Sequence, residues 1–136
     1  MPADPELAPI WRIVFRQKGF FNMASAVIFI AGVAVSEPFA EWTRTDTAGS
    51  MMYFDIFLAH AFFFGAIYWW MADHPLRHRA ILYLSIPIEI SFMSIVLGNA
   101  IAGVIPVWLI IPGLQDGLCA VLFTILLRNN PEPARG

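Results

Sequence analysis

Charged residues are scarce in this chain. Asp, Glu, Lys and Arg together make up 13% of its 136 residues, against about 25% in a typical soluble domain. Hydrophobic residues make up 59%, and the mean hydropathy is +0.68. A soluble domain of this size cannot bury so much apolar surface, and a disordered chain would contain far less of it. We therefore expect the lipid bilayer to be the surroundings of this protein.

Cysteine and basic clusters are equally sparse. A single cysteine, Cys119, excludes an internal disulfide and CxxC redox chemistry. The net charge of −2 and the lack of a basic run give nucleic acid no electrostatic footprint, so we expect no nucleic-acid partner. No HExxH motif is present, and His60 is the only histidine within an apolar segment. We therefore predict no metal and no bis-histidine haem, and expect no cofactor.

Four apolar segments are long enough to cross a bilayer, which takes about 20 residues. They cover approximately residues 19–36, 51–71, 80–102 and 107–127. Their apolar character is continuous rather than alternating, which favours helices over a barrel. The fold class predicted is all-α: an integral membrane four-helix bundle, antiparallel, forming a single transmembrane domain over residues 1–136. The short turn around residues 103–106 predicts a close hairpin of the last two helices.

The basic residues predict the orientation of the helices. Seven of the eight Lys and Arg residues, Lys18 among them, precede the first span, lie in the loop after the second, or follow the fourth. Only Arg44 lies on the other side, so both termini are expected in the cytoplasm. Every Trp and Tyr, including Tyr68, falls at a predicted membrane boundary, where such rings are common.

Small residues and prolines indicate where the helices pack and bend. Gly32 and Ser36, like Gly98 and Ala102, are spaced four apart and would permit close helix contact, although small residues are common in membrane helices in any case. Proline removes a backbone hydrogen bond. The two prolines within the third and fourth spans, Pro87 and Pro112, are therefore expected to kink their helices or to open them locally.

Three ionisable residues lie deep within different spans. At 1.5 Å per residue, His60, Glu89 and Asp116 each lie about 13 Å from the nearer end of their segments, close to the middle of a hydrocarbon core of about 30 Å. A charge there costs at least about 2.5–3.5 kcal/mol. We therefore expect the three groups to compensate one another and to titrate as a coupled set. Structural hydrogen bonding between helices, without chemistry, is the alternative.

Other polar residues extend this predicted site. Ser85 precedes Glu89 by one turn, and Gln115 adjoins Asp116. Asp55 and Asn99 are expected nearer the outer surface, where extension of Asp55 to water is favoured and an outer mouth lined by both residues is the alternative. The loop of residues 72–79 is interpreted as an anchoring segment that sets topology rather than as a specific site.

The sequence resembles the small DoxX-like proteins of bacterial inner membranes. The resemblance rests on Asn22, Pro38, the pattern Ala72-Asp73-x-Pro75-x-Arg77-x-Arg79, and Asp116 ahead of Arg128. It covers nearly the whole chain with short motifs. It implies four helices and an inner-membrane location, and it carries no catalytic residue onto this sequence.

Three functions are compatible with these patterns. The first is proton-linked handling of a small solute or cation, which in so small a chain implies a homodimer. The second is a membrane-embedded, isomerase-like enzyme that acts on an apolar lipid, with a buried carboxyl delivering a proton. The third is a non-catalytic accessory subunit of a membrane complex, in which the polar residues fix helix register.

Overall fold

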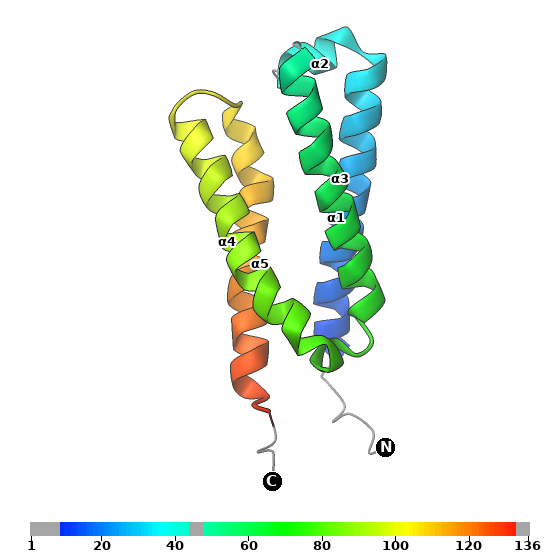
Figure 1. Ribbon diagram of the computed structural model, residues 1–136, viewed down its shortest axis with the longest axis vertical. Coiled ribbons are helices and arrows are strands. Elements are labelled where there is room, and N and C mark those ends of the chain that lie inside the picture. The colour runs from blue at the N-terminus through cyan, green and yellow to red at the C-terminus, as the bar shows by residue number, and fades with distance from the viewer. Residues whose placement is uncertain (1–8, 44–47, 133–136) are drawn as a thin grey trace. The chain divides into compact units, whose positions relative to one another are not determined.

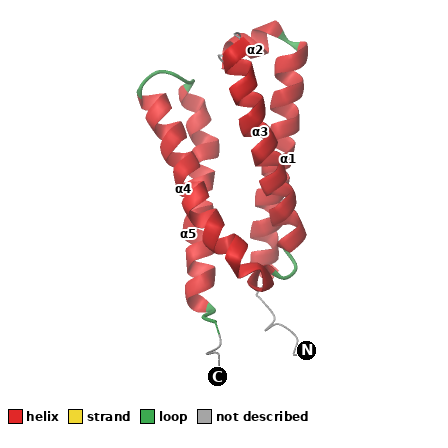
Figure 2. Ribbon diagram, viewed as in Figure 1, coloured by secondary structure: helices red, strands yellow, loops and turns green. Residues whose placement is uncertain are grey.

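The computed structural model describes residues 9–43 and 48–132. Nearly all of them are helical, and no strand occurs among them (Figure 2). The elements in chain order are α1 (Pro9–Val35), α2 (Glu37–Thr43), α3 (Ala48–Met71), η1 (Pro75–His78), α4 (Arg79–Ile101), η2 (Val107–Leu109) and α5 (Ile110–Asn129). Within the described residues, α1, α3, α4 and α5 each provide a stretch that is long and apolar enough to cross a membrane. The four predicted spans are therefore confirmed.

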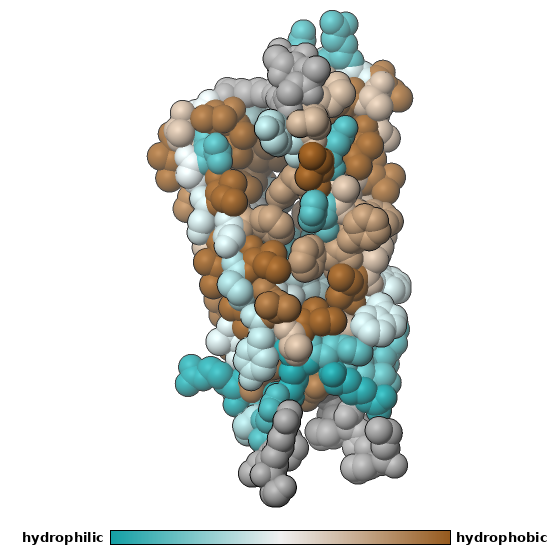
Figure 3. Space-filling view, viewed as in Figure 1, coloured by the Kyte–Doolittle hydropathy of each residue, from teal (hydrophilic) through white to brown (hydrophobic). Residues whose placement is uncertain are grey.

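The chain divides into two compact units, Met1–His74 and Pro75–Gly136. In the first unit α1 packs along α3, and α2 caps the connection between them (Figure 1). In the second unit α4 packs along α5. Apolar side chains cover most of the face seen in Figure 3, and hydrophilic ones gather at its lower end. The connection between α4 and α5 is itself apolar, with Ile101, Val104 and Val107 exposed. The expected single domain over residues 1–136 stays a prediction.

The first unit is held together by a close approach of two glycines. A Cβ added at Gly19 would lie 2.7 Å from the carbonyl oxygen of Gly65, and one added at Gly65 would lie 2.7 Å from the carbonyl oxygen of Gly19. The two backbones therefore touch, as small residues permit in membrane helices. The buried apolar side chains of this unit are Phe15, Ala26, Val33, Ala40, Leu58, Tyr68, Met71 and Ala72.

The small residues chosen from the sequence have other roles. Gly32 packs against the ring of Phe39 in α2 rather than against a second span. The Ser36 hydroxyl accepts a hydrogen bond from the Phe39 amide, 3.3 Å away, and so caps α2. Gly98 has no atom within 4 Å of its added Cβ. Gly98 therefore makes no close contact with α5, and a helix contact at Gly98 stays a prediction.

The second unit is closed at both ends. Gly103 has a φ of 69°, and its amide bonds the carbonyl of Ala100 while the Val104 amide bonds that of Asn99. This is a Schellman motif, which ends α4 and confirms the predicted tight turn. At the other end, the Arg79 guanidinium donates to the carbonyl of Asn130, the residue that follows α5.

The two prolines behave differently. Pro87 lies inside α4, and Figure 1 shows that helix bending in its first half, where Pro87 is located. Pro112 lies in the first turn of α5, because that helix begins at Ile110 and not within residues 107–109. Amides of a first turn have no intrahelical partner, so a proline there removes no hydrogen bond. The predicted span is instead divided just before Pro112, between the 3-10 helix η2 and α5, in keeping with the expected local opening and without a kink inside α5.

Candidate functional site

The most deeply buried acidic residue of the chain's described part is Glu89. It lies near the middle of α4 and is 2% exposed. Ser85, one turn earlier, is also buried, and its hydroxyl donates to the carbonyl of Ile81, 2.8 Å away. A carboxyl group this far inside an apolar helix is costly to keep charged without compensation. Glu89 is therefore the first candidate for a functional group.

Glu89 lies on the face of α4 that meets α5. A Cβ added at Gly113 would lie 3.1 Å from the Cβ of Val96, and one added at Gly117 would meet the Met93 sulfur. Met93 and Val96 follow Glu89 by four and seven residues, so all three share one helix face. The two glycines leave room for α5 to approach that face closely.

Asp116 lies on the neighbouring part of α5. It is half-buried and follows Gly113 by three residues, while Gln115 beside it is also half-buried. Gly113 of α5 faces Val96 of α4, and Gly117 faces Met93. One turn farther along the two helices, the same register places Ala120 opposite Glu89. Asp116 precedes Ala120 by four residues, and so lies about 6 Å farther along the pair than Glu89. The α4–α5 pair thus carries two carboxyl groups about one turn apart.

His60 belongs to the first unit and lies on α3. Its side chain is exposed, and Nδ1 lies 2.7 Å from the carbonyl oxygen of Ile56. A carbonyl only accepts, so Nδ1 carries the proton of this bond. Because Glu89 and Asp116 belong to the second unit, the three-residue site stays a prediction.

Asp55 and Asn99 also belong to different units. Asp55 is half-buried in the first third of α3. The Asn99 side-chain amide donates to the carbonyl of Ile95, 2.8 Å away, and the Asn99 backbone carbonyl takes part in the turn after α4. Asn99 thus serves the end of its own helix, and an outer mouth shared with Asp55 stays a prediction. Ser91 and Ser94 likewise donate to carbonyls of α4 itself.

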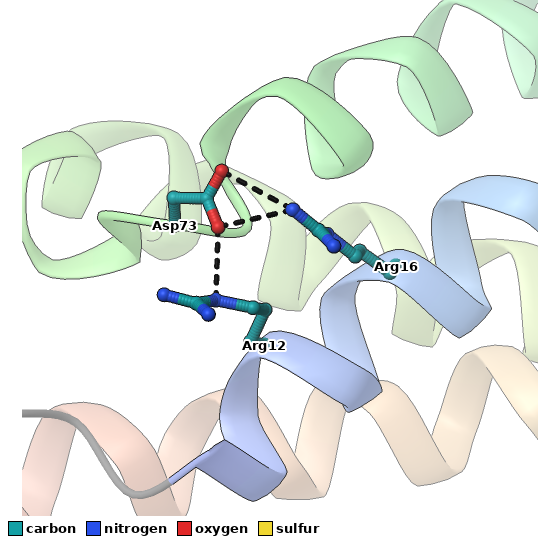
Figure 4. A network of polar contacts seen from close by, with 3 residues as sticks. All are labelled: Arg12, Arg16 and Asp73. Atoms are coloured by element: carbon teal, nitrogen blue, oxygen red, sulfur yellow. Dashed lines mark hydrogen bonds and ion pairs between the residues drawn. The ribbon is translucent and has the colours of Figure 1, made fainter.

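Two basic residues of α1 converge on Asp73, an arrangement that the sequence analysis did not foresee (Figure 4). The Arg12 Nε lies 2.9 Å from Asp73 Oδ1, and an Arg16 terminal nitrogen lies 3.2 Å from the same oxygen and 3.4 Å from Oδ2. The Arg16 guanidinium also stands 5.7 Å from the centre of the Trp69 ring. The predicted order of the spans already placed residues 12–16 and residue 73 on the same side of the membrane. That shared side was the only sequence signal for their ion pairs.

Lys18 is a correction to the predicted start of the first helix. Lys18 was expected before the first span, but α1 begins at Pro9 and Lys18 is 1% exposed within it. The Tyr68 ring is fully buried against Phe15 and Phe64, with ring centres 6.3 and 6.2 Å away, and its position at a membrane boundary stays a prediction. Trp69 and Trp70, which follow it, are exposed. One helix end therefore presents aromatic rings both to the interior and to its surroundings.

Residues 9–43 and 48–132 contain no cluster of side chains that could bind a metal ion. No three His, Cys, Asp or Glu side chains are grouped there in a way that could hold a metal ion.

The resemblance to DoxX-like proteins stays a prediction, because no comparison with known proteins supports or contradicts it. Compared with protein-family models, curated proteins and solved structures, the chain finds no match.

Proposed function

We propose that this chain is a multi-pass protein of a bacterial inner membrane that links the movement of a proton to that of a small solute or cation, with Glu89 as the proton- or cation-binding group. The observation that supports this is a carboxyl group 2% exposed, midway along an apolar helix. Ionisable groups at such depth most often serve a pathway, because their insertion cost otherwise works against folding.

The chemistry follows from charge balance. In an apolar interior a carboxylate is stabilised either by a proton or by a cation, and exchange of one for the other links their movements. Asp116, one turn farther along the α4–α5 pair, would provide the next carboxyl group for the transferred proton or cation. The bend of α4 near Pro87 would let that helix move around Glu89.

The proposal includes a topology. The helices run antiparallel with both termini in the cytoplasm, in keeping with the seven-to-one distribution of basic residues. Four helices enclose little space for a pathway, and we therefore propose a homodimer as the working form.

Proton flux in proteoliposomes tests the role of Glu89. A potassium gradient with valinomycin drives protons inward, and a trapped pH dye reports their entry. We expect Glu89→Gln to lower the initial flux at least about tenfold, the usual scale for loss of a proton-transfer group. Asp55→Asn, a half-buried carboxyl nearer a helix end, is the matched control and should keep the wild-type flux.

The outcomes distinguish the three functions. Wild-type flux in a folded Glu89→Gln variant would overturn the role of Glu89. If wild-type vesicles move no more protons than protein-free ones when potassium, sodium or a small organic cation is supplied as the coupled species, the proton-handling proposal fails. A lipid-filled pocket beside Glu89 that opens sideways to the bilayer would then favour the membrane-embedded enzyme. The accessory subunit would be favoured by full function of a partner complex with Glu89→Leu and Asp116→Leu combined.

A further inference from the structure

The cluster formed by Arg12, Arg16 and Asp73 carries more positive than negative charge. Two guanidinium groups share one carboxylate (Figure 4), which leaves a net charge of +1 on these three residues. The side chains of Arg12 and Arg16 are 58% and 46% exposed. The excess charge is therefore open to the surroundings of the protein and not enclosed in its core.

The carboxylate fixes how the two arginines present their remaining donors. Arg12 contacts Asp73 through Nε, so its two terminal nitrogens are turned away from the carboxylate in Figure 4. Arg16 uses one terminal nitrogen for both carboxylate oxygens. The planar fork of an arginine suits the oxygens of a phosphate group. A fork that is already held in place loses less side-chain freedom when it binds.

The aromatic residues beside the cluster indicate its depth. The Arg16 guanidinium stacks over Trp69, and both Trp69 and Trp70 are exposed. Exposed tryptophans at the end of a membrane helix are typical of the headgroup region of a bilayer. At that depth, a net positive, pre-formed pair of arginines would meet lipid phosphates.

We propose that Arg12 and Arg16 form a binding site for the phosphate group of an anionic phospholipid, whose single negative charge balances the +1 of the cluster. Asp73 holds the two guanidinium groups apart for this contact. The site lies entirely within the first unit and does not depend on the role proposed for Glu89.

Native mass spectrometry of the full-length protein in detergent tests the proposal. The probe is phosphatidylglycerol, titrated into the protein and compared with phosphatidylcholine of the same acyl chains. We expect Arg12→Gln and Arg16→Gln each to weaken phosphatidylglycerol binding about fivefold, the contribution of one basic residue near an anionic lipid surface. Far-UV circular dichroism should show unchanged helix content, because both side chains lie on the exposed side of α1.

Arg128→Gln is the matched control, since Arg128 is exposed in the last turn of α5 and belongs to no such cluster. It should leave phosphatidylglycerol binding unchanged. Equal weakening by Arg128→Gln would show that only general surface charge is involved, and would overturn the proposal. Displacement of the lipid by inorganic phosphate at matched concentration would assign the cluster to free phosphate instead. Equal binding of phosphatidylcholine would also contradict the selectivity.

Discussion

At the scale of single residues, contact between the helices of the first unit depends on Gly19 and Gly65. The spacing of small residues along single helices had instead indicated Gly32 and Gly98 as contact positions. Two helices come into close contact where a glycine of one faces the backbone of the other, and this depends on how each helix is rotated about its own axis. The spacing of glycines along one helix does not specify that rotation. Gly65 was therefore missed, although it lies inside a predicted span.

The Gly65 contact gives a sharp prediction for stability. Gly65→Ala would place its new Cβ 2.7 Å from the Gly19 carbonyl oxygen and 2.9 Å from the Asn22 Cβ. Backbone cannot move aside as a side chain can, so we expect a loss of about 2 kcal/mol in the free energy of unfolding. Unfolding in a mixed micelle, followed by circular dichroism over a titration with sodium dodecyl sulfate, measures that loss.

Gly98→Ala is the control for this substitution. It also adds one methyl group to a membrane helix, but with open space around it. Its free energy of unfolding should stay within about 0.5 kcal/mol of the wild type. Similar destabilisation by both variants would show that the added methyl group itself, and not the contact between α1 and α3, decides the outcome.

The candidate site was partly predictable at this same scale. Glu89 could be identified because a carboxyl group in an apolar run is conspicuous, and its burial agrees with that reading. The link between Arg12 and Asp73 was not foreseen, because 61 residues separate them and charged residues near helix ends were interpreted as topology signals alone. The pairing required knowing that α1 extends to Pro9 and brings Arg12 beside the end of α3.

At the scale of elements, the long apolar helices were predictable and the short helix was not. Continuous apolar runs located α3, α4 and α5 to within a few residues. The seven residues of α2 are too few for a periodic pattern, and their cap, Ser36, was interpreted as a packing residue. The start of α1 was placed too late, because its first two turns mix arginines with apolar residues and lie outside the purely apolar run.

The different positions of the two prolines lead to a prediction for α4. Pro87→Ala would supply an N–H group that bonds the carbonyl of Tyr83 and removes the clash that bends the helix. We expect α4 to straighten and its amides around residue 87 to exchange with deuterium at least about tenfold more slowly, for a gain of about 1 kcal/mol. Hydrogen–deuterium exchange of the reconstituted protein, resolved by peptide, measures this change.

Pro112→Ala provides the comparison, because the first-turn amide that it restores has no partner within α5. Exchange in α5 should be unchanged in that variant. If the two substitutions slowed exchange equally, the difference assigned here to position within a helix would be wrong.

At the scale of the whole molecule, the apolar composition predicted the membrane and the number of spans. The four helices of the described residues that can cross a bilayer agree with that prediction. The orientation of the helices was predicted from a separate signal, the distribution of the basic residues. One of them, Lys18, is buried within α1 and does not belong to a segment that precedes the first helix. Six basic residues then remain against Arg44 alone, so the proposed orientation is retained.

Reporter fusions test that orientation. Alkaline phosphatase, which is active only outside the cytoplasm, should be inactive when fused after residue 136 and active when inserted between α2 and α3. A fluorescent protein that matures only in the cytoplasm should give the opposite result at both positions. Phosphatase activity at the C-terminus would contradict the proposed topology and, with it, the side on which the arginine cluster meets its lipid.

The length of α1 has a consequence for how the protein fits its membrane. Its 27 residues extend about 40 Å, whereas the hydrocarbon layer is only about 30 Å thick. The surplus falls where Arg12 and Arg16 are located, so a thicker bilayer can take up another turn of preformed helix without any residue having to refold. The shorter helix α5, with 20 residues, has no such reserve and would have to draw the surrounding lipid inward. Membrane thickness should thus strain the second unit before it strains the first.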